Sequence, residues 1–362
     1  MAQRLPPRPV ARAGLRARGA LLRAADALLP AEVAVLEQSW GFYRTLLLGV
    51  MAELGVADEL ARGRRSAVQV AAALGLDADY LHRVLRALAV HGVVRLDRRG
   101  RFRLTRAGRR LTSADDRSVA AWVRYLNLPS TQTAGSALAT ALRTGEPPFP
   151  AVHGRSVWDH FAAHPEEERL FAAAMREVTR IELPAVVRGY PWPERGTVCD
   201  VAGGVGTVLA AILRARPRLR GKLVDAAGVL REAEEHLARA GVRDRVDLEL
   251  GNIFERVEAA ADVYVLKDVL HDWDDDRSAR ILATVRAAMG PGARLVLVER
   301  VQERNEADPI TSLVDLHMLT QCDGGRQRSV GELHGLLRGA GLEPGQVRLT
   351  AGPALVEGLA AA

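Results

Sequence analysis

The stretch that decides the fold is Val263-Tyr264-Val265-Leu266-Lys267-Asp268-Val269-Leu270-His271-Asp272-Trp273-Asp274-Asp275-Asp276. It begins as an apolar run typical of a buried β-strand and ends in a histidine that lies among carboxylates. Open α/β sheets present active sites in this way, because polar side chains follow the carboxyl ends of the buried strands. His271 is therefore the first candidate for a chemical role. The aspartates at 274–276 are interpreted as caps of a helix over 277–289, since Asp favours the N-cap and the first turn.

The residues on both sides of this stretch repeat the same alternation. Strands are predicted at Thr197–Ala202, Lys222–Ala226, Val246–Leu250, Asp262–Lys267 and Arg294–Val301. Helices are predicted near Thr207–Ala215, Val229–Gly241 and Arg277–Met289, with a short link at 254–260. Short apolar runs separated by helices indicate an α/β fold with a mostly parallel sheet covered on both faces. Two late runs, 347–350 and 354–359, are expected to add an antiparallel hairpin at the edge, for seven strands.

The first third of the chain is strongly basic. Residues 1–112 contain 20 Arg and 9 acidic residues, whereas the whole chain of 362 residues carries a formal charge of +6. Residues 1–20 lack an apolar periodicity and are interpreted as a disordered basic tail. From 21 to 55 the pattern is helical, and its strongest part, 31–51, is apolar over much of its circumference. Such a helix must be buried, which a second subunit would achieve.

A small module follows at residues 66–105. Helices over 66–75 and 80–91 precede two short strands at 93–96 and 101–105. A helix pair followed by a hairpin predicts a winged helix, which could read DNA with the helix 80–91. That helix uses these residues as a core face: Leu81, Val84, Leu85, Leu88 and Ala89. Only His82, Arg83 and Arg86 are left for bases or phosphates, which disfavours DNA binding. The basic first third of the chain nonetheless keeps a DNA-binding regulator open as an alternative.

The next segment is predicted to be helical and to end at Pro191-Trp192-Pro193, which marks a domain boundary. The expected domains are a tail at 1–20, a helical and winged-helix domain at 21–112, a helical linker at 113–193 and an α/β domain at 194–362. The linker carries aromatic and Met side chains at helical spacing, among them Phe171 and Met175. Such side chains line either a packed core or the wall of a ligand pocket.

Composition excludes several classes of protein. Hydrophobic residues make up 48% of the chain, too many for a disordered protein. No apolar run approaches the roughly 20 residues that a membrane helix needs, and no secretion signal is recognisable. The two cysteines, Cys199 and Cys322, indicate a reduced, cytoplasmic setting. Because no Cys/His cluster is recognisable, no metal is expected.

A glycine-rich turn follows the first predicted strand, with the sequence Asp200-Val201-Ala202-Gly203-Gly204-Val205-Gly206-Thr207. Its glycines let the backbone approach a ligand closely, although the dinucleotide fingerprint G-x-G-x-x-G is incomplete because Leu209 stands at its last position. Asp225 ends the second strand, where it can bind ribose hydroxyls, and Asn252 follows the third. With Lys267 and His271, these polar residues lie at the carboxyl ends of consecutive strands, where a nucleoside would bind.

These motifs resemble those of the class I S-adenosylmethionine-dependent O-methyltransferases that act on small molecules. This family includes the plant caffeate and flavonoid enzymes and bacterial enzymes that tailor natural products. The resemblance spans about residues 40–350, and the motifs that carry it are His153-Gly154, Phe161, Phe171, Met175, Asp200–Gly206, Leu266-Lys267, Leu270-His271-Asp272-Trp273, Glu299 and Gly324-Gly325-Arg326. It implies a Rossmann-like cofactor domain preceded by a winged-helix domain that forms a homodimer, with no role in binding nucleic acid or membrane.

The resemblance also implies S-adenosyl-L-methionine as cofactor. The residues expected to bind it are Asp200, Gly203, Gly204, Asp225, Asn252, Ile253 and Lys267. The glycine turn would hold the methionine portion and Asp225 the ribose. Asn252 and Ile253 would meet the adenine, with Lys267 nearby.

By the same resemblance, His271 is the general base and Glu299 orients it. A neutral imidazole, with a pKa of about 6.5, can accept the proton of a phenol, whose pKa is about 10. A carboxylate on the other ring nitrogen fixes the tautomer and stabilises the imidazolium. The sulfonium needs no metal, because an acceptor oxygen held in line behind its methyl supplies much of the acceleration. The acceptor pocket is expected to include Phe171, Met175, Trp273 and Met318.

Some positions depart from the family pattern. Asn252 replaces the usual Asp, although its carbonyl oxygen can still accept from an adenine amino group. Ala202 replaces a common first glycine, and Asp225 is followed by Ala-Ala-Gly in place of Leu-Pro-His. Gln327 stands in place of a second acid beside the histidine, which removes a charge that would stabilise protonated His271.

Three functions are therefore open. The leading one is methyl transfer from S-adenosylmethionine to a hydroxyl, phenolic by expectation, of a small aromatic natural product, with a carboxylate as a further acceptor. The second is an enzyme on the same scaffold that binds the cofactor but carries out hydroxylation, decarboxylation or cyclisation, for which Asn252 and Gln327 leave room. The third is the DNA-binding regulator.

Overall fold

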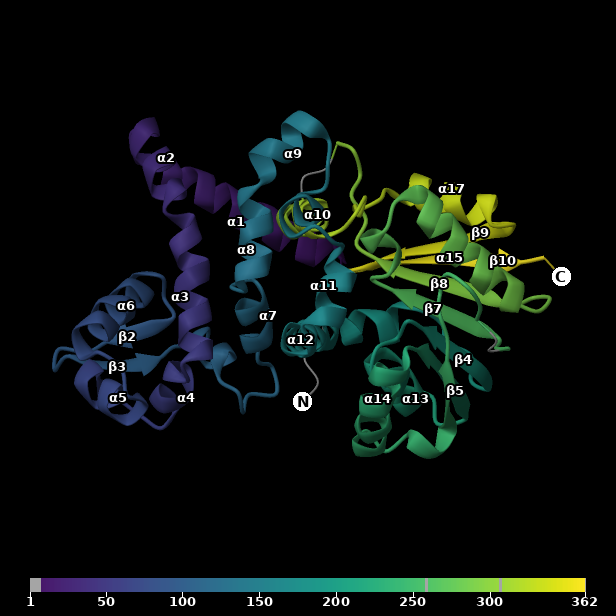
Figure 1. Ribbon diagram of the computed structural model, residues 1–362, viewed down its shortest axis with the longest axis horizontal. Helices are drawn as coiled ribbons and strands as arrows, with labels where there is room; N and C mark the ends of the chain where they lie inside the picture. The colour runs from purple at the N-terminus through teal and green to yellow at the C-terminus, as the bar shows by residue number, and fades with distance from the viewer. Residues whose placement is uncertain (1–7, 258–259, 306–307, 362) are drawn as a thin grey trace. The chain divides into compact units, whose positions relative to one another are not determined.

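The computed structural model describes residues 8–257, 260–305 and 308–361, and the chain divides into two compact units (Figure 1). Unit 1 takes residues 8–13, 134–157 and 182–361 of the described chain. Unit 2 takes residues 14–133 and 158–181. Residues 134–157, expected in the helical linker, therefore belong to the unit that contains the large sheet.

Unit 1 is built on one mixed β-sheet. Its strands are β4 (Gly196–Val201), β5 (Leu219–Asp225), β6 (Val246–Leu250), β7 (Val263–Lys267), β8 (Arg294–Glu299), β9 (Leu342–Leu349) and β10 (Ala354–Ala360). They lie in the order β6-β5-β4-β7-β8-β10-β9. The first five strands in this order are parallel to one another, whereas β10 runs antiparallel to both β8 and β9. The predicted seven-stranded, mostly parallel sheet with an antiparallel edge hairpin is confirmed.

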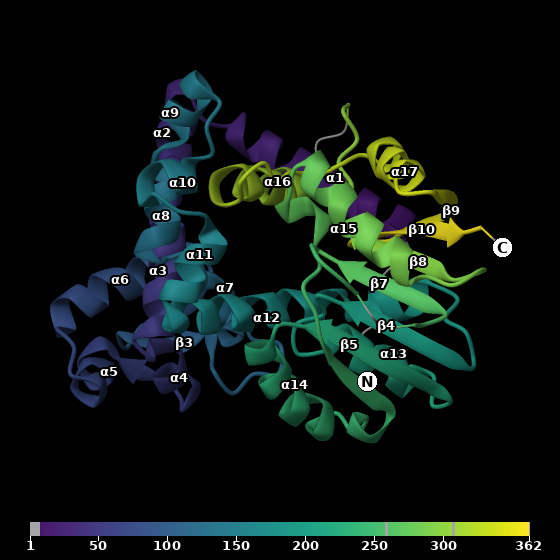
Figure 2. The same cartoon turned by 45° about the vertical axis from the view of Figure 1, so that its right-hand side comes forward.

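Helices cover both faces of this sheet, because successive side chains of each buried strand point to opposite faces. In β7, Tyr264 and Leu266 join one core, and Val263 and Val265 join the other. Helices α15 (Asp275–Ala288) and α17 (Val330–Gly339) pack on the first face. Helices α13 (Thr207–Ala215) and α14 (Ala227–Arg239) pack on the second, as does the end of α12 (Pro165–Gly189). Figure 2 shows the sheet between these two layers of helices.

The order of the strands places a ligand site at the centre of the sheet. From β4 the chain moves first to one side, through β5 and β6, and then to the other, through β7 and β8. Ligands of open α/β sheets bind outside the carboxyl ends of the strands at such a reversal. The glycine turn after β4 and the His271 stretch after β7 both lie at this reversal.

Shorter elements complete unit 1. They are α9 (Leu138–Thr144), α10 (Pro148–His153), η2 (Arg243–Arg245), η3 (Leu270–Asp272) and α16 (Pro309–Gln321). Helix α1 (Arg8–Asp26) begins in unit 1 and continues into unit 2, and α8 (Pro129–Ser136) and α11 (Val157–Ala163) also cross between the units. No helix in the described part of the chain is both long enough and apolar enough to cross a bilayer.

Unit 2 contains the expected helix pair and hairpin. Its remaining elements are α2 (Ala31–Ser39), α3 (Gly41–Glu53), α4 (Val56–Ala61), β1 (Arg65–Ser66), α5 (Ala67–Leu74), α6 (Ala78–Val90), β2 (Val94–Leu96), β3 (Arg101–Leu104), η1 (Gly108–Leu111) and α7 (Ala120–Tyr125). Ser66 caps α5 in a capping box with Gln69, and Asp77 caps α6. Strand β1 adds to the hairpin by pairing with β3, which the sequence analysis did not predict.

Two predictions in the N-terminal part are wrong. Residues 8–20 were expected to be a disordered tail, but they lie in α1, because Arg and Ala are strong helix formers. Residues 1–7 of that tail lie outside the described residues. The single helix expected over 31–51 is two helices, α2 and α3, which meet at Trp40.

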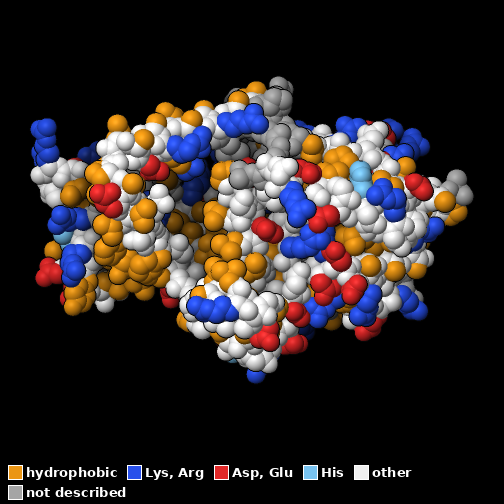
Figure 3. Space-filling model, turned by 90° about the horizontal axis from the view of Figure 1, so that it is seen from above, with side chains coloured by type: hydrophobic (Ala, Val, Ile, Leu, Met, Phe, Trp, Pro, Cys, Tyr) orange, Lys and Arg blue, Asp and Glu red, His pale blue; other side chains and the backbone are white. Residues whose placement is uncertain are grey.

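The segment around this junction exposes large hydrophobic side chains. None of the residues of α2 is buried within the chain. Large side chains with between 41% and 66% of their surface exposed are Val33, Val35, Leu36, Trp40, Phe42 and Tyr43. Hydrophobic side chains also gather on the left-hand part of the surface in Figure 3, where unit 2 lies. Exposed apolar surface of this extent marks an interaction site.

Candidate active site

The His271 side chain is carried by a short turn that follows β7. Asp268, just after the strand, has a φ of 52°, a left-handed conformation that turns the chain sharply. The 3₁₀ turn η3 (Leu270–Asp272) then carries His271. Asp274 caps the following helix α15 by accepting a hydrogen bond from the Arg277 amide, as predicted for one of the aspartates.

A buried arginine holds this turn in place. The side chain of Arg328 is 2% exposed and donates to the carbonyl oxygens of Leu270, at 2.6 Å, and Trp273, at 2.7 Å. It also pairs with Asp275 at 2.8 Å. The Arg326 amide donates to the His271 carbonyl at 2.8 Å, and no side chain fits at Gly325, whose Cβ would lie 2.7 Å from that same oxygen. The loop 324–328 therefore fixes the backbone of His271 from both sides.

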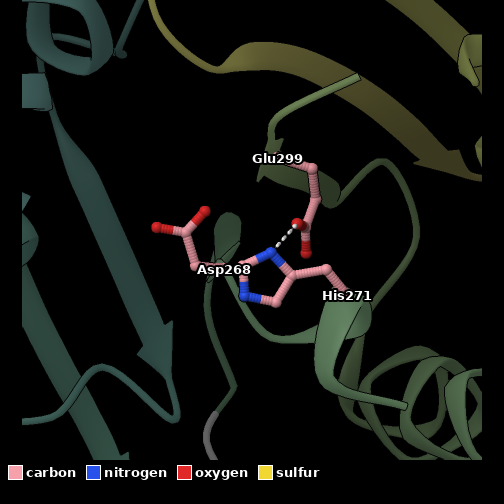
Figure 4. Close-up of side chains that lie close together, drawn as sticks. All are labelled: Asp268, His271 and Glu299. Atoms are coloured by element: carbon pink, nitrogen blue, oxygen red, sulfur yellow. Dashed lines mark ion pairs between the residues drawn. The ribbon is translucent and has the colours of Figure 1, made fainter. Parts of the chain in front are cut away.

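The imidazole of His271 has polar neighbours at both ring nitrogens. Nδ1 lies 2.9 Å from the Gln327 side-chain nitrogen and 3.4 Å from Glu299 Oε2. Nε2 lies 3.4 Å from Asp272 Oδ1. Figure 4 shows Glu299 directed at the ring, with Asp268 nearby. The structure therefore brings the two predicted catalytic residues, His271 and Glu299, into contact.

Glu299 is buried at the end of β8 and is 2% exposed. Its Oε1 accepts hydrogen bonds from the amides of Leu270, at 2.9 Å, and Val269, at 3.2 Å. Burial raises the pKa of Glu299 to about 7, although the nearby His271 acts to lower it. The same carboxyl group thus shapes the His271 turn and faces its ring.

Lys267 lies in a network of buried charges. Its ammonium lies 2.9 Å from Glu182 Oε2 and pairs with Asp268, while Arg300 holds the other Glu182 oxygen at 2.5 Å. Burial acts to lower the pKa of Lys267, but the Asp268 and Glu182 carboxylates outweigh it and raise that pKa. Lys267 was expected near the cofactor, and its described partners are carboxylates from α12 and from the residue that follows it.

The glycine turn after β4 forms an open cradle above a buried acid. Gly204, with a φ of 59°, has nothing within 4 Å of the position of a Cβ, whereas a Cβ at Gly203 would lie 2.4 Å from Asp200 Cγ. Asp200 is 1% exposed, and burial raises its pKa to about 7. Its carboxylate accepts from the Leu209 amide at 3.3 Å, so it braces the turn from beneath.

Asp225 connects the end of β5 to this cradle. Its carboxylate accepts hydrogen bonds from the amides of Gly204, at 2.8 Å, and Ala226, at 2.7 Å. Burial raises the pKa of this carboxyl. Two backbone amides do not use all the acceptor capacity of a carboxylate, which leaves room for ligand hydroxyls.

Asn252 makes no contact with Asp225 or Gly204 among its described hydrogen bonds. It is exposed, and its side chain closes its own turn by accepting from the Phe254 amide at 3.0 Å and donating to Glu255 at 2.9 Å. The neighbouring Ile253 is half-buried, and its carbonyl accepts from Thr284 at 2.7 Å. Both polar atoms of Asn252, which stands where the family pattern has Asp, are thus hydrogen-bonded within a local turn.

The four residues expected in the acceptor pocket fall in both units. Trp273 packs edge to face on Phe254 at 4.8 Å, and Met318 is buried on α16 beside Cys322. Phe171 and Met175 belong to unit 2. There the ring of Phe171, which is partly buried, stacks on Phe161 at 4.8 Å and contacts Tyr125 of the same unit.

Asp268, His271 and Glu299 also form a group whose ligand atoms lie within 4.8 Å of one another. Carboxylates and imidazole are suitable metal ligands. Here, however, Asp268 is neutralised by Lys267, and His271 Nδ1 faces the Gln327 amide at 2.9 Å. Because two of the three possible metal ligands already have partners, the group is better suited to proton transfer than to metal binding.

Several residues of this site escaped the sequence analysis. They are Glu182 and Asp268, which pair with Lys267, Arg300, which pairs with Glu182, and Arg328, which holds the His271 turn. Asp268 and Arg328 adjoin quoted motifs, so their position was a usable signal. Glu182 lies on a helix far from the strands in sequence, and no local pattern marks it.

The fold agrees with comparisons to known proteins. An O-methyltransferase domain model matches residues 136–343, and an O-methyltransferase dimerisation domain model matches residues 36–114. The chain is 38% identical over 327 residues to the O-demethylpuromycin-O-methyltransferase of Streptomyces alboniger, covering 89% of this chain and 86% of that one. It is also 34% identical over 302 residues to the aclacinomycin 10-hydroxylase RdmB of Streptomyces purpurascens, covering 82% and 80%.

Solved structures give the same result. The crystal structure of LaPhzM superposes with a TM-score of 0.87 at 34% identity, over 92% of this chain and all of that one. That of NcsB1, from neocarzinostatin biosynthesis, was solved with S-adenosyl-L-homocysteine and 1,4-dihydroxy-2-naphthoic acid, and matches with a TM-score of 0.75 at 31% identity over 88% and 96%. The chain therefore belongs to the S-adenosylmethionine-dependent O-methyltransferase family. Its cofactor is S-adenosyl-L-methionine.

Proposed function

We propose that this enzyme transfers a methyl group from S-adenosylmethionine to a hydroxyl, phenolic by preference, of a small aromatic natural product, with His271 as general base. The observation that carries the proposal is the contact of His271 Nδ1 with buried Glu299, 3.4 Å apart, at the carboxyl end of the central strands. A carboxylate at Nδ1 makes Nε2 the nitrogen that takes the acceptor proton.

The cofactor would lie across the ends of β4 and β5. The open backbone at Gly204 leaves room for its methionine portion, and the remaining acceptor capacity of Asp225 suits its ribose hydroxyls. The bound cofactor supplies an electrophilic methyl on a sulfonium, so the protein has to orient the acceptor oxygen and remove its proton. As the oxygen–methyl bond forms and the sulfur–methyl bond breaks, the hydroxyl proton passes to His271.

A second candidate function uses the same scaffold without net methyl transfer. The 34% identity to a hydroxylase supports it, as does the neutral side chain of Gln327 beside His271. In this case the cofactor would bind in the same place, and the acceptor would leave without a methyl group.

Incubation with methyl-labelled S-adenosylmethionine separates these two functions. The acceptor panel should contain phenols, hydroxybenzoates, hydroxynaphthoates and, as a control class, aromatic amines. Label in phenolic products, together with stoichiometric S-adenosylhomocysteine, supports the first function. Label-free products with an added hydroxyl or a lost carboxyl group support the second.

We further propose that the enzyme is a homodimer through unit 2. The match to a dimerisation domain model and the exposed side chains of Leu36, Trp40 and Phe42 support this assembly. Analytical ultracentrifugation of wild type and the Trp40→Asp/Phe42→Asp double variant tests it. We expect a dimer and a monomer, respectively, and a monomeric wild type at micromolar concentration would contradict the proposal.

A further inference from the structure

The strongest unassigned feature of the site is the hydrogen bond between Gln327 and His271. The Gln327 side-chain nitrogen lies 2.9 Å from Nδ1, closer than the Glu299 carboxylate at 3.4 Å. An amide nitrogen can only donate, so Nδ1 must accept in this arrangement. A neutral imidazole that accepts at Nδ1 carries its proton on Nε2. That is the tautomer in which Nε2 cannot act as a base.

Gln327 is held in place by its backbone. Gln327 is 5% exposed, and its backbone N–H donates a hydrogen bond to Asp315 Oδ1 at 2.6 Å. The next residue, Arg328, is locked to the carbonyls around His271. Among the described residues, the Gln327 side-chain oxygen has no hydrogen-bond partner although it is buried. Such an oxygen gains by turning toward a donor.

The other side of the ring completes the arrangement. Nε2 lies 3.4 Å from Asp272 Oδ1, so a proton on Nε2 faces an acceptor. Glu299 Oε2 also lacks a hydrogen-bond partner among the described residues, and it faces Nδ1. If the proton stood on Nδ1, Glu299 Oε2 could accept it, the Gln327 oxygen could also accept it after a half-turn of the amide, and the Nε2 lone pair would be free.

We propose that Gln327 is a positioning residue that selects the tautomer of His271 by a half-turn of its side-chain amide. With the amide nitrogen toward Nδ1, the histidine rests with its proton on Nε2, facing Asp272. With the amide oxygen toward Nδ1–H, the Nε2 lone pair is exposed to the acceptor hydroxyl. The catalytic part of this proposal rests on the proposed role of His271, whereas the tautomer itself does not.

An amide can perform this exchange and a carboxylate cannot. A carboxylate at position 327 would accept from Nδ1–H in every orientation and would hold the base ready at all times. The ionisable groups around the ring are Asp268 after β7, Asp272 on η3, Glu299 on β8 and His317 on α16. Next to Nδ1, Gln327 can both donate and accept in its single charge state, whereas Glu299 needs a proton before it can donate.

The tautomer can be read directly by long-range ¹H–¹⁵N correlation of histidine-labelled protein, with His271 assigned by its loss in His271→Ala. In the protein without acceptor, we expect neutral His271 of the wild type to carry its proton on Nε2. Gln327→Glu should move the proton to Nδ1, and Gln327→Met, which removes the donor, should populate both tautomers. Gln346→Glu, on the exposed edge strand β9, is the matched control and should leave the wild-type pattern unchanged.

The result that would overturn the proposal is a wild-type His271 with its proton on Nδ1, or the same tautomer in all four proteins. S-adenosylhomocysteine binding by calorimetry shows that each variant is folded. Kinetics separate this role from a merely structural one. Gln327→Glu should move the acidic limb of the kcat/KM pH profile to higher pH, while the cofactor KM changes less than twofold. Failure of the base assignment would show instead as methylation by His271→Ala, whatever the tautomer.

Discussion

Arg328 donates a hydrogen bond of 2.6 Å to the carbonyl oxygen of Leu270, the residue immediately before His271. With its second bond, to the Trp273 carbonyl, the guanidinium spans the whole turn that carries the imidazole. The orientation of the proposed base is therefore set by a residue 57 positions later in the chain, outside the sheet.

Replacing this arginine should damage both stability and activity. Arg328→Met removes the charged donor from both carbonyls and leaves them only longer hydrogen bonds, from the Ser278 hydroxyl to both and from the Trp273 amide to Leu270. Each charged hydrogen bond contributes about 1.5–3 kcal/mol. We expect the free energy of unfolding to fall by about 2–4 kcal/mol and kcat/KM to fall more than tenfold. Denaturant unfolding and steady-state kinetics measure these changes. Arg326→Met, whose ion pairs to Asp275 and Glu332 are exposed, is the control and should lower stability by less than about 1 kcal/mol. Equal effects of the two variants would contradict the conclusion that Arg328 sets the orientation of the His271 turn.

Ala202 should be a source of backbone strain. Its φ of 53° is unfavourable for a residue with a Cβ, by about 1–2 kcal/mol. We expect Ala202→Gly to raise the free energy of unfolding by up to about 1 kcal/mol, after the larger entropy of the unfolded glycine chain is subtracted. Thermal or denaturant unfolding measures it. Ala238→Gly, at an exposed position of α14, should instead lower stability by about 0.5–1 kcal/mol. A loss of stability in both would show that the turn is not strained.

Asp200 should make stability depend on pH. Because burial raises the pKa of Asp200 from 3.8 to about 7, the folded protein binds its proton more tightly than the unfolded chain does. The stabilisation is complete below about pH 4 and is lost as the pH rises to about 7, by about 2–4 kcal/mol. Asp200→Asn should make this slope smaller and leave the part that comes from Glu299, whose pKa burial also raises to about 7, whereas Asp247→Asn, at an exposed position of β6, should keep the full slope. Unfolding curves between pH 4 and 7 test it, and an unchanged slope in Asp200→Asn would refute the assignment.

Asp225 should contribute to cofactor affinity through its charge. Asp225→Asn keeps the size of the side chain but weakens hydrogen bonds to ribose hydroxyls by about 1–2 kcal/mol. We expect the dissociation constant of S-adenosylhomocysteine, measured by calorimetry, to rise about tenfold or more. Asp262→Asn, which affects an aspartate at the opposite end of β4, serves as the control. An unchanged affinity in Asp225→Asn would place the ribose elsewhere.

The sequence predicted those features that depend on local pattern. The five parallel strands follow from short apolar runs, and Ser66, Asp77 and Asp274 cap helices as their residue types indicate. The contact of His271 with Glu299 was expected from the resemblance to a known family. The structure explains it, because His271 follows β7 and Glu299 ends β8, and these two strands are parallel neighbours.

Other features could not be predicted, because they depend on tertiary contacts. Lys267 pairs with Glu182, which lies on a helix before the sheet begins, and no periodicity marks that pair. The left-handed backbone of Asp268 and the break between α2 and α3 at Trp40 have only weak signals in residue type: Asp tolerates a positive φ, and Gly41 follows the break. The helix at 8–20 was missed because its composition was interpreted as charge without structure.

The central claim, that His271 is the base for methyl transfer, is tested most directly by single-turnover methylation with His271→Ala. Labelled S-adenosylmethionine and the best acceptor from the panel would be mixed with excess enzyme, and S-adenosylhomocysteine affinity would be measured on the same sample. We expect the rate to fall by at least about 10²-fold, the usual contribution of a general base, while cofactor affinity stays within twofold. A rate near that of the wild type, with the cofactor bound normally, would contradict the account.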